Sequence, residues 1–200
     1  MSIDHLLNMG ETIDLMETYE YIQSMGHGTY GQVHKCRKIS TGEIVALKEM
    51  INHNAGNAIR VELLMLQAIS CLDPDANNLI QFNYAFKSTD GCYFMEFEML
   101  DQSVWDFMGR RNSSFSLCEI RPMAKGLMVA LKALADVGVI HTDLKPDNVM
   151  LVDFERQPFK VKLIDFGVSI FQFPGAIMEW LQPAPYRAPE VTLGLRSLRQ

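Results

Sequence analysis

The sequence predicts an α+β fold in which a five-stranded antiparallel unit comes first and a helical unit follows. Residues 19–99 carry short apolar runs with strand-like alternation, divided by turn signals, and only one segment of helical period. Residues 117–137 then place apolar side chains at three- and four-residue spacing over a longer stretch, which is typical of an amphipathic helix. A chain of 200 residues is long enough for one large domain or for two small units.

The first unit is expected to contain five strands and one helix. The strands are predicted at residues 19–25, 32–38, 44–50, 79–86 and 92–99. Turn signals lie at a Gly-rich segment, at Ser40-Thr41-Gly42 and at the hairpin pair Asp90-Gly91. Residues 58–70 change to helical period, because Ile59, Leu63, Leu66 and Ile69 recur on one face.

The second unit is expected to begin with the long helix. Ser116 and Glu119 form a capping-box pattern at its start, and Gly138 marks its end. Two short strands are predicted near residues 149–152 and 160–164, and the prolines beyond Gly167 predict a long loop. The expected organisation is a flank and two units, at residues 1–18, 19–100 and 101–200.

Composition and charge exclude several classes of function. The apolar fraction of 48% is ordinary for a globular chain, and the net charge of −6 argues against direct binding of nucleic acid. The four cysteines form no C-x-x-C pair, so neither a zinc site nor a disulfide framework is predicted, and a reduced intracellular setting fits. No apolar run is long enough to span a membrane, and the first residues lack the pattern of a signal peptide.

The first chemical signal is the segment Gly26-His27-Gly28-Thr29-Tyr30-Gly31-Gln32-Val33. Glycines at these three positions let a turn pass close to phosphates and offer backbone N–H groups to them. The same pattern alone also fits a plain β-turn. Because it joins two strands, a P-loop or a dinucleotide-binding fold is disfavoured.

Lys48 ends the next strand, in Val45-Ala46-Leu47-Lys48, where its ammonium could reach phosphates held by the glycine turn. Glu62 follows in the predicted helix and could orient Lys48 through an ion pair. A lone lysine at the end of a strand is usually a solvated charge, and Glu62 taken alone also fits a solvated helix face.

Three further motifs occur in order along the second unit. They are His141-Thr142-Asp143-Leu144-Lys145-Pro146-Asp147-Asn148, Asp165-Phe166-Gly167 and Ala188-Pro189-Glu190. A buried aspartate or a hydrogen-bonded asparagine is the usual interpretation of such residues singly. In this order and spacing they match the protein-kinase signature set, and the chain resembles a eukaryotic protein kinase from Tyr19 to its last residues.

Within that family the chain resembles the homeodomain-interacting protein kinases, which are relatives of the dual-specificity tyrosine-regulated kinases. The residues that carry this resemblance are Gly28 to Cys36, Phe97-Glu98-Met99-Leu100, Asp143 to Asp153, Arg156-Gln157-Pro158 and Tyr186-Arg187-Ala188-Pro189-Glu190. The resemblance implies a protein-kinase-like bilobal fold with its N-lobe at 19–100 and its C-lobe at 101–200. Since only residues 191–200 follow Glu190, we expect the C-lobe to be incomplete and the kinase domain to be truncated after the A-P-E motif.

The resemblance implies ATP and Mg²⁺ as cofactors and a protein serine or threonine hydroxyl as acceptor. It assigns catalytic roles to Asp143, which accepts or orients the hydroxyl proton, and to Lys145, which steadies the γ-phosphate charge. Asn148 and Asp165 would hold the metal. The implied ATP-binding residues are Met25, Gly26, His27, Gly28, Thr29, Tyr30, Gly31, Gln32, Val33, Lys48, Glu62, Glu98 and Leu100. His141 is expected to be structural.

The sequence departs from the kinase pattern at two further positions. Thr142 stands where many kinases have an arginine that pairs with a phosphorylated activation loop, and the homeodomain-interacting group usually has alanine there. Trp180 stands where that group has a tyrosine that the kinase phosphorylates on itself. We therefore expect activity that does not depend on tyrosine phosphorylation of this loop.

Two functions stay open. The complete set of phosphate- and metal-binding residue types favours an active protein serine/threonine kinase. Trp180 and the expected loss of C-lobe helices favour a weak or inactive ATP-binding module that modulates a full-length relative. The expected location is nuclear or cytoplasmic. The resemblance alone favours the nucleus and implies transcription-regulator partners.

Overall fold

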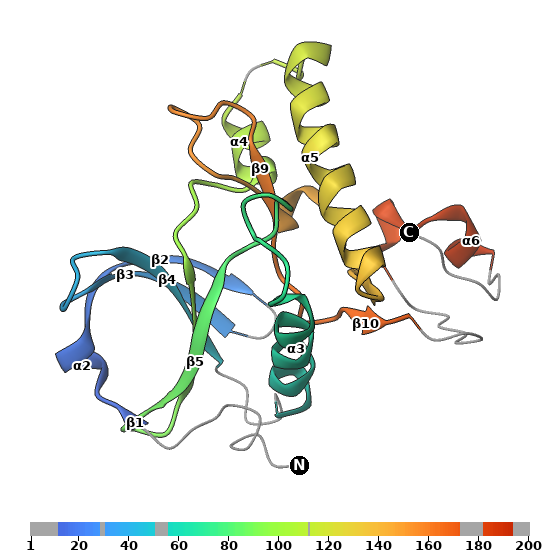
Figure 1. Ribbon diagram of the computed structural model, residues 1–200. Coiled ribbons are helices and arrows are strands. Elements are labelled where there is room, and N and C mark those ends of the chain that lie inside the picture. The colour runs from blue at the N-terminus through green and yellow to red at the C-terminus, as the bar shows by residue number, and fades with distance from the viewer. Residues whose placement is uncertain (1–11, 29–30, 51–55, 112, 173–181, 194–200) are drawn as a thin grey trace. The chain divides into compact units, whose positions relative to one another are not determined.

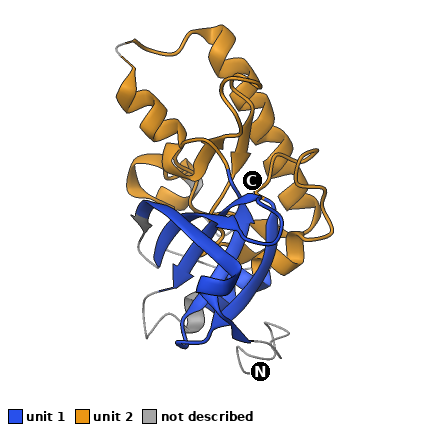
Figure 2. Ribbon diagram, turned by 90° about the vertical axis from the view of Figure 1, so that its left-hand side faces the viewer, with its two compact units in different colours: residues 1–64, 81–99 blue, residues 65–80, 100–200 orange. Residues whose placement is uncertain are grey.

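The computed structural model describes residues 12–28, 31–50, 56–111, 113–172 and 182–193. The chain divides into two compact units, shown in Figure 2: unit 1 comprises Met1–Leu64 and Gln81–Met99, and unit 2 comprises Met65–Ile80 and Leu100–Gln200. Unit 1 is built around a sheet, and unit 2 around a long helix with short paired strands (Figure 1).

Unit 1 contains a six-stranded sheet in the order β1-β5-β6-β4-β3-β2. The strands are β1 (Thr12–Ile13), β2 (Tyr19–Gly28), β3 (Gly31–Lys38), β4 (Ile44–Met50), β5 (Phe82–Ser88) and β6 (Tyr93–Glu98). Strands β2 to β6 are the five antiparallel strands that the sequence predicted. The prediction missed β1, which runs parallel to β5, and the short helix α2 (Leu15–Thr18), because both lie in the expected flank. A two-residue strand is too short to show an alternating pattern.

The predicted strand at 79–86 begins later than expected. β5 starts at Phe82, while Leu79 and Ile80 belong to unit 2 and lie beside Leu163. The N–H of Ile80 donates to the carbonyl of Leu163 at 3.1 Å, and the N–H of Leu163 donates to the carbonyl of Asn78 at 2.9 Å. The residues predicted as one strand are therefore divided between the two units, and only those from Phe82 on belong to β5.

One hydrophobic cluster of unit 1 combines aromatic and aliphatic side chains. Its buried members are Tyr19, Cys36, Val45, Leu47, Phe86 and Phe94. The ring of Phe86 stacks on Tyr19 at 5.8 Å and on Phe94 at 5.5 Å between centroids. The fully buried carboxylate of Glu96 accepts hydrogen bonds from Tyr19, Lys38 and Asn83, so its burial is compensated by several donors.

Unit 2 is organised by the helix α5 (Leu117–Asp136). The predicted capping box of Ser116 and Glu119 is present at its start. The side chain of Arg111 donates to Glu119, and this hydrogen bond, followed by the one from the Ser116 backbone, lowers the pKa of Glu119 to about 2. A Cβ added to Gly126 would lie 3.2 Å from Cγ2 of Val161, so α5 packs closely on the strand that contains Val161.

Short elements complete unit 2. The helices are α3 (Gly56–Ile69), which the boundary between the units divides, α4 (Val104–Arg110) and α6 (Pro189–Thr192), with 3₁₀ turns η1 (Pro146–Asn148) and η2 (Ala184–Tyr186). The strands form two antiparallel pairs, β8 (Val149–Leu151) with β9 (Val161–Leu163) and β7 (Val139–Ile140) with β10 (Ile170–Phe171). β10, η2 and α6 correct the prediction of a long loop after Gly167. No helix among the described residues is long and apolar enough to cross a membrane.

Gly31 and Gly26 differ sharply in the space around them, so an alanine substitution at Gly26 is a suitable control for one at Gly31. A Cβ at Gly31 would lie 1.9 Å from the backbone oxygen of Glu49, whereas a Cβ at Gly26 would meet nothing within 4 Å. We predict that Gly31→Ala lowers the free energy of unfolding by about 1–3 kcal/mol, because β3 and β4 must separate locally. Gly26→Ala is expected to leave it within about 0.5 kcal/mol. Urea titration checks both, and equal midpoints for the two variants would contradict the close approach.

Candidate active site

The glycine turn lies at the end of the β2–β3 hairpin, as the sequence predicted. Gly26 pairs with Val33, His27 with Gln32 and Gly28 with Gly31. The predicted site residues Thr29 and Tyr30 lie outside the described residues. Met25 is partly exposed in β2 beside this turn. The turn thus connects two strands, and its binding of ATP phosphates stays a prediction.

Lys48 and Glu62 form a close ion pair within unit 1. β4 supplies Lys48 and α3 supplies Glu62, so a strand and a helix position the two side chains. Nζ of Lys48 lies 2.6 Å from Oε1 and 2.8 Å from Oε2 of Glu62, whose side chain is almost wholly buried. Removing one partner of such a pair leaves an uncompensated buried charge. The pair therefore restricts where the Lys48 ammonium can lie.

The predicted adenine-binding residues lie at the end of β6 and just after it. The N–H of Glu98 donates to the carbonyl of Gln81 at 3.1 Å, and its carboxylate accepts from the N–H of Gln81 at 2.6 Å. Leu100 is buried and belongs to unit 2. These contacts hold the end of β6 at Glu98 against Gln81.

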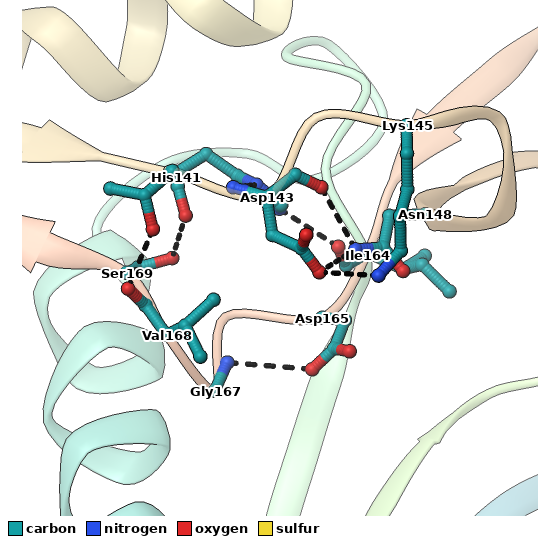
Figure 3. Close-up of polar contacts among 10 residues, drawn as sticks. His141, Asp143, Lys145, Asn148, Ile164, Asp165, Gly167, Val168 and Ser169 are labelled. Atoms are coloured by element: carbon teal, nitrogen blue, oxygen red, sulfur yellow. Dashed lines mark hydrogen bonds and ion pairs between the residues drawn. The ribbon is translucent and has the colours of Figure 1, made fainter. Parts of the chain in front are cut away.

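Asp143, Lys145 and Asn148 form a hydrogen-bonded cluster in unit 2, which Figure 3 shows. Oδ2 of Asp143 accepts from Nζ of Lys145 at 2.8 Å and from Nδ2 of Asn148 at 2.7 Å. Nδ2 of Asn148 also donates to the backbone oxygen of Asp143 at 2.9 Å. Burial acts to lower the pKa of Lys145, but the hydrogen bond and charge of Asp143 outweigh it and raise that pKa. Lys145 is therefore held as a cation beside the Asp143 carboxylate.

Asp165 follows β9 and has a left-handed backbone conformation, with φ of 65°. Such a conformation is costly for a residue other than glycine and persists only where neighbouring contacts enforce it. One carboxylate oxygen accepts weakly from the N–H of Gly167 at 3.4 Å (Figure 3). The N–H of Ile164 donates to the backbone oxygen of Asn148 at 3.0 Å. Backbone bonding thus ties the residue before Asp165 to Asn148.

His141 lies next to the backbone of Asp143 and Ile164, and its side chain is almost wholly buried. Its Nδ1 accepts from the N–H of Asp143 at 3.2 Å, so the ring proton lies on Nε2, which donates to the carbonyl of Ile164 at 2.9 Å. Burial lowers the pKa of His141 and outweighs the opposing effects of the Ile164 carbonyl, Asp165 and Asp143. The neutral imidazole therefore bonds to both the loop that carries Asp143 and the segment that leads to Asp165.

Asn148 and Asp165 have the donor chemistry of a magnesium site. Because Nδ2 of Asn148 makes the two bonds to Asp143, the amide oxygen is the atom suited to coordinate a cation. Mg²⁺ prefers oxygen ligands and is commonly held by one or two carboxylates together with substrate phosphates. The described residues contain no group of three or more histidine, cysteine, aspartate or glutamate residues able to hold a metal. An ion shared with a phosphate substrate fits this sparse donor set.

Two residues beside the Asp143 motif, Thr142 and Ser169, make contacts that the sequence did not predict. The hydroxyl of Thr142 donates to the carbonyl of Val168 at 2.7 Å, and that of Ser169 donates to the carbonyl of His141 at 3.0 Å. In the sequence, Thr142 stands out only as a departure from the arginine that many kinases have there. Ser169 carried no signal, because a lone serine after the Asp-Phe-Gly motif is an ordinary residue type.

Comparison with known proteins places the chain among kinase domains. Residues 19–198 match the family model of the protein kinase domain. Homeodomain-interacting protein kinase 2 of Mesocricetus auratus is 39% identical over 183 residues, covering 90% of this chain and 16% of that protein. Homeodomain-interacting protein kinase 4 of Mus musculus is also 39% identical over 90% of this chain, covering 30% of that protein. The chain thus spans less than a third of these curated relatives.

A solved structure shows the same fold. The crystal structure of a kinase domain matches with a TM-score of 0.81 and 27% sequence identity, covering 89% of this chain and 58% of that one. This likeness confirms the predicted kinase-like α+β fold.

The neutral state of His141 leads to a prediction about pH. The unfolded chain has a histidine pKa of about 6.5, whereas the folded pKa is lower, so the unfolded state binds the proton first as the pH falls. We predict that this contribution to stability is present above about pH 6.5 and falls by at most about 1.4 kcal/mol per pH unit below it, until the folded pKa is reached.

His141→Gln tests this because glutamine can accept from Asp143 and donate to Ile164 without titrating. Urea unfolding of both proteins at several pH values between 7.5 and 5 gives the difference between their slopes of stability against pH. Parallel pH profiles for the two proteins would contradict a neutral His141.

Proposed function

The chain belongs to the protein kinase domain family, and we propose that it is an ATP-dependent serine/threonine protein kinase that transfers the γ-phosphate to a protein hydroxyl. The observation that carries this proposal is the Asp143 cluster. One carboxylate oxygen is bonded by both Lys145 and Asn148, so the carboxylate has a fixed orientation and a permanent cation beside it. Phosphoryl transfer depends on such positioning and charge neutralisation more than on covalent chemistry.

Asp143 would act on the acceptor hydroxyl and Lys145 on the transferred group. As the hydroxyl oxygen forms its bond to the γ-phosphorus, the bond from that phosphorus to the β,γ-bridging oxygen breaks and ADP leaves. The hydroxyl proton passes to the Asp143 carboxylate. The ammonium of Lys145, besides bonding to Asp143, would neutralise charge on the γ-phosphoryl oxygens.

The predicted ATP-binding residues would hold the nucleotide. Lys48, held by Glu62 at 2.6 Å, would contact the α- and β-phosphates. The backbone of the glycine turn would cover the phosphates with N–H groups. Backbone groups of Glu98 and Leu100 would bond to the adenine ring.

The metal would be held by unit 2. Mg²⁺, when bound, would neutralise phosphate charge and orient the phosphates for displacement. We propose the amide oxygen of Asn148 and the carboxylate of Asp165 as its protein ligands.

The residues of the catalytic loop and the names of the relatives bear on the acceptor class and the partners. The segment Asp143-Leu144-Lys145-Pro146 has the form found in serine/threonine kinases and supports that acceptor class. The relatives are named homeodomain-interacting, so we propose transcription regulators among the partners and the nucleus as the location. We further propose residues 19–100 as the N-lobe and 101–200 as the C-lobe.

Asp143→Asn provides the main test of this function. We predict that it lowers kcat for phosphate transfer to a serine/threonine peptide by about 10²- to 10⁴-fold, because a general base is lost. Binding of Mg-ATP is expected to stay within about threefold of the wild-type value, a difference below 1 kcal/mol. Radiolabelled transfer and titration calorimetry measure the two quantities. Asp147→Asn is the matched control, since Asp147 is exposed in the same loop.

The outcome separates the two functions. Transfer by the wild-type chain that Asp143→Asn abolishes supports the kinase. Mg-ATP binding by the wild-type chain without any transfer would instead support the ATP-binding module.

A second prediction concerns Tyr186, which is exposed in η2. Thr142 offers no cation to a phosphate, and Trp180 offers no hydroxyl to modify. We expect Tyr186→Phe and tyrosine-phosphatase treatment each to leave kcat within about twofold, a change of less than 0.5 kcal/mol. Mass spectrometry that links activity to phosphotyrosine at Tyr186 would refute this independence.

A further inference from the structure

Two buried hydroxyl groups join the segment after Asp165-Phe166-Gly167 to the loop that carries Asp143. Oγ1 of Thr142 donates to the carbonyl of Val168 at 2.7 Å. Oγ of Ser169 donates to the carbonyl of His141 at 3.0 Å, as Figure 3 shows. Thr142 is 5% exposed and Ser169 is 1% exposed. We call these two hydrogen bonds the hydroxyl clamp.

Backbone pairing continues the same connection away from the reactive residues. Ile170 pairs with Ile140, and Phe171 pairs with Val139, in the antiparallel β10–β7 pair. The N–H of Gln172 then donates to the carbonyl of Gly138 at 2.8 Å. The hydroxyl clamp therefore lies where this short ladder meets the loop of Asp143.

The clamp also lies at a point of backbone strain. Thr142 has φ of 64°, a left-handed conformation that is a genuine outlier for a β-branched residue. Asp143 follows directly, so any relaxation of Thr142 would turn the backbone that aims the Asp143 carboxylate. Strained conformations of this kind persist when surrounding contacts over-determine them. The hydrogen bond from Thr142 to Val168 is one such contact.

Both donors of the clamp are neutral. An arginine at position 142 would offer charge-assisted hydrogen bonds to a phosphate, and the hydroxyl of Thr142 does not. The hydroxyl instead bonds to a backbone carbonyl that is present in every state of modification. A buried neutral hydrogen bond is also little affected by salt, in contrast to exposed charge pairs.

We propose that Thr142 and Ser169 are positioning residues, whose hydroxyl clamp holds the loop of Asp143 against the segment after Asp165 without a phosphate. The structural part of this proposal stands on the contacts alone. Its catalytic consequence rests on the proposed kinase function. The regulation that follows is an active-site arrangement fixed by folding and independent of loop phosphorylation.

Hydrogen exchange tests the structural part without requiring activity. Thr142→Val keeps the β-branched shape and removes the donor, whereas Thr142→Ser keeps the donor. We expect Thr142→Val and Ser169→Ala each to speed amide exchange in the peptide of residues 166–172 by about tenfold, since a buried carbonyl loses its partner. Thr142→Ser is expected to stay within about twofold of the wild-type rate. Exchange in β2 to β4 serves as the internal control for global unfolding.

Kinetics test the positioning role on the same proteins. Thr142→Val is expected to lower kcat about tenfold with KM for ATP within about twofold, because the orientation of Asp143 is affected and nucleotide binding is not. Thr142→Ser, which keeps the hydroxyl donor, should retain the wild-type kcat. Prior phosphatase treatment should change none of these ratios.

Each outcome decides a separate claim. Unchanged exchange in Thr142→Val overturns the clamp, whatever the activity. Faster exchange with unchanged kcat overturns the positioning role. Faster exchange with no transfer by any protein, the wild type included, supports the clamp and overturns the proposed kinase function. If exchange in β2 to β4 speeds up by the same factor as exchange in residues 166–172, the variant is destabilised globally. That result would also overturn a local clamp.

Discussion

The arrangement of the candidate active site depends on the neutral imidazole of His141. One ring nitrogen accepts from the N–H of Asp143 and the other donates to the carbonyl of Ile164. Only the neutral Nε2–H tautomer can do both, because a protonated ring has two donors and no acceptor. Burial favours that state, so the solvation cost of charging the ring protects the geometry. The positions of Asp143 and Asp165 are thereby linked through one uncharged side chain.

Each unit holds its own charged residues in place by local means. In unit 1 a buried glutamate fixes Lys48, and strand and helix supply the two side chains independently. In unit 2 Asp143 is fixed by Lys145 and Asn148, all within six residues of chain. An ion pair across elements requires the tertiary fold of its unit, whereas the Asp143 cluster requires mainly the η1 turn. Disruption of the helix α3 should therefore affect Lys48 more directly than it affects Asp143.

Elements with a local signal could be predicted from the sequence, and elements that depend on distant partners could not. The long helix α5 was predictable from its period and from Ser116 and Glu119, and the five longer strands were predictable from alternation and turns. β1 and β10 have two residues each, so pairing with β5 and β7 decides their conformation. The motifs indicated Lys48, Glu62, Asp143, Asn148 and Asp165 because their spacing is distinctive. The contacts of Thr142 and Ser169 with backbone carbonyls had no such signal, since hydroxyl residues bond to the backbone in many settings.

In unit 2 the side chains proposed to contact the substrate are charged, whereas those that hold the surrounding backbone are neutral. The charged side chains Asp143, Lys145 and Asp165 are those proposed to meet the phosphates, the metal and the acceptor hydroxyl. The groups that hold the backbone around them, His141, Thr142 and Ser169, are neutral. A charged group in that frame would change the electrostatic potential at Asp143, and a phosphate would add nearly two negative charges beside two carboxylates. A neutral frame leaves that potential to the few residues that act on the substrate, which is the physical reason to expect an arrangement that needs no phosphate to form.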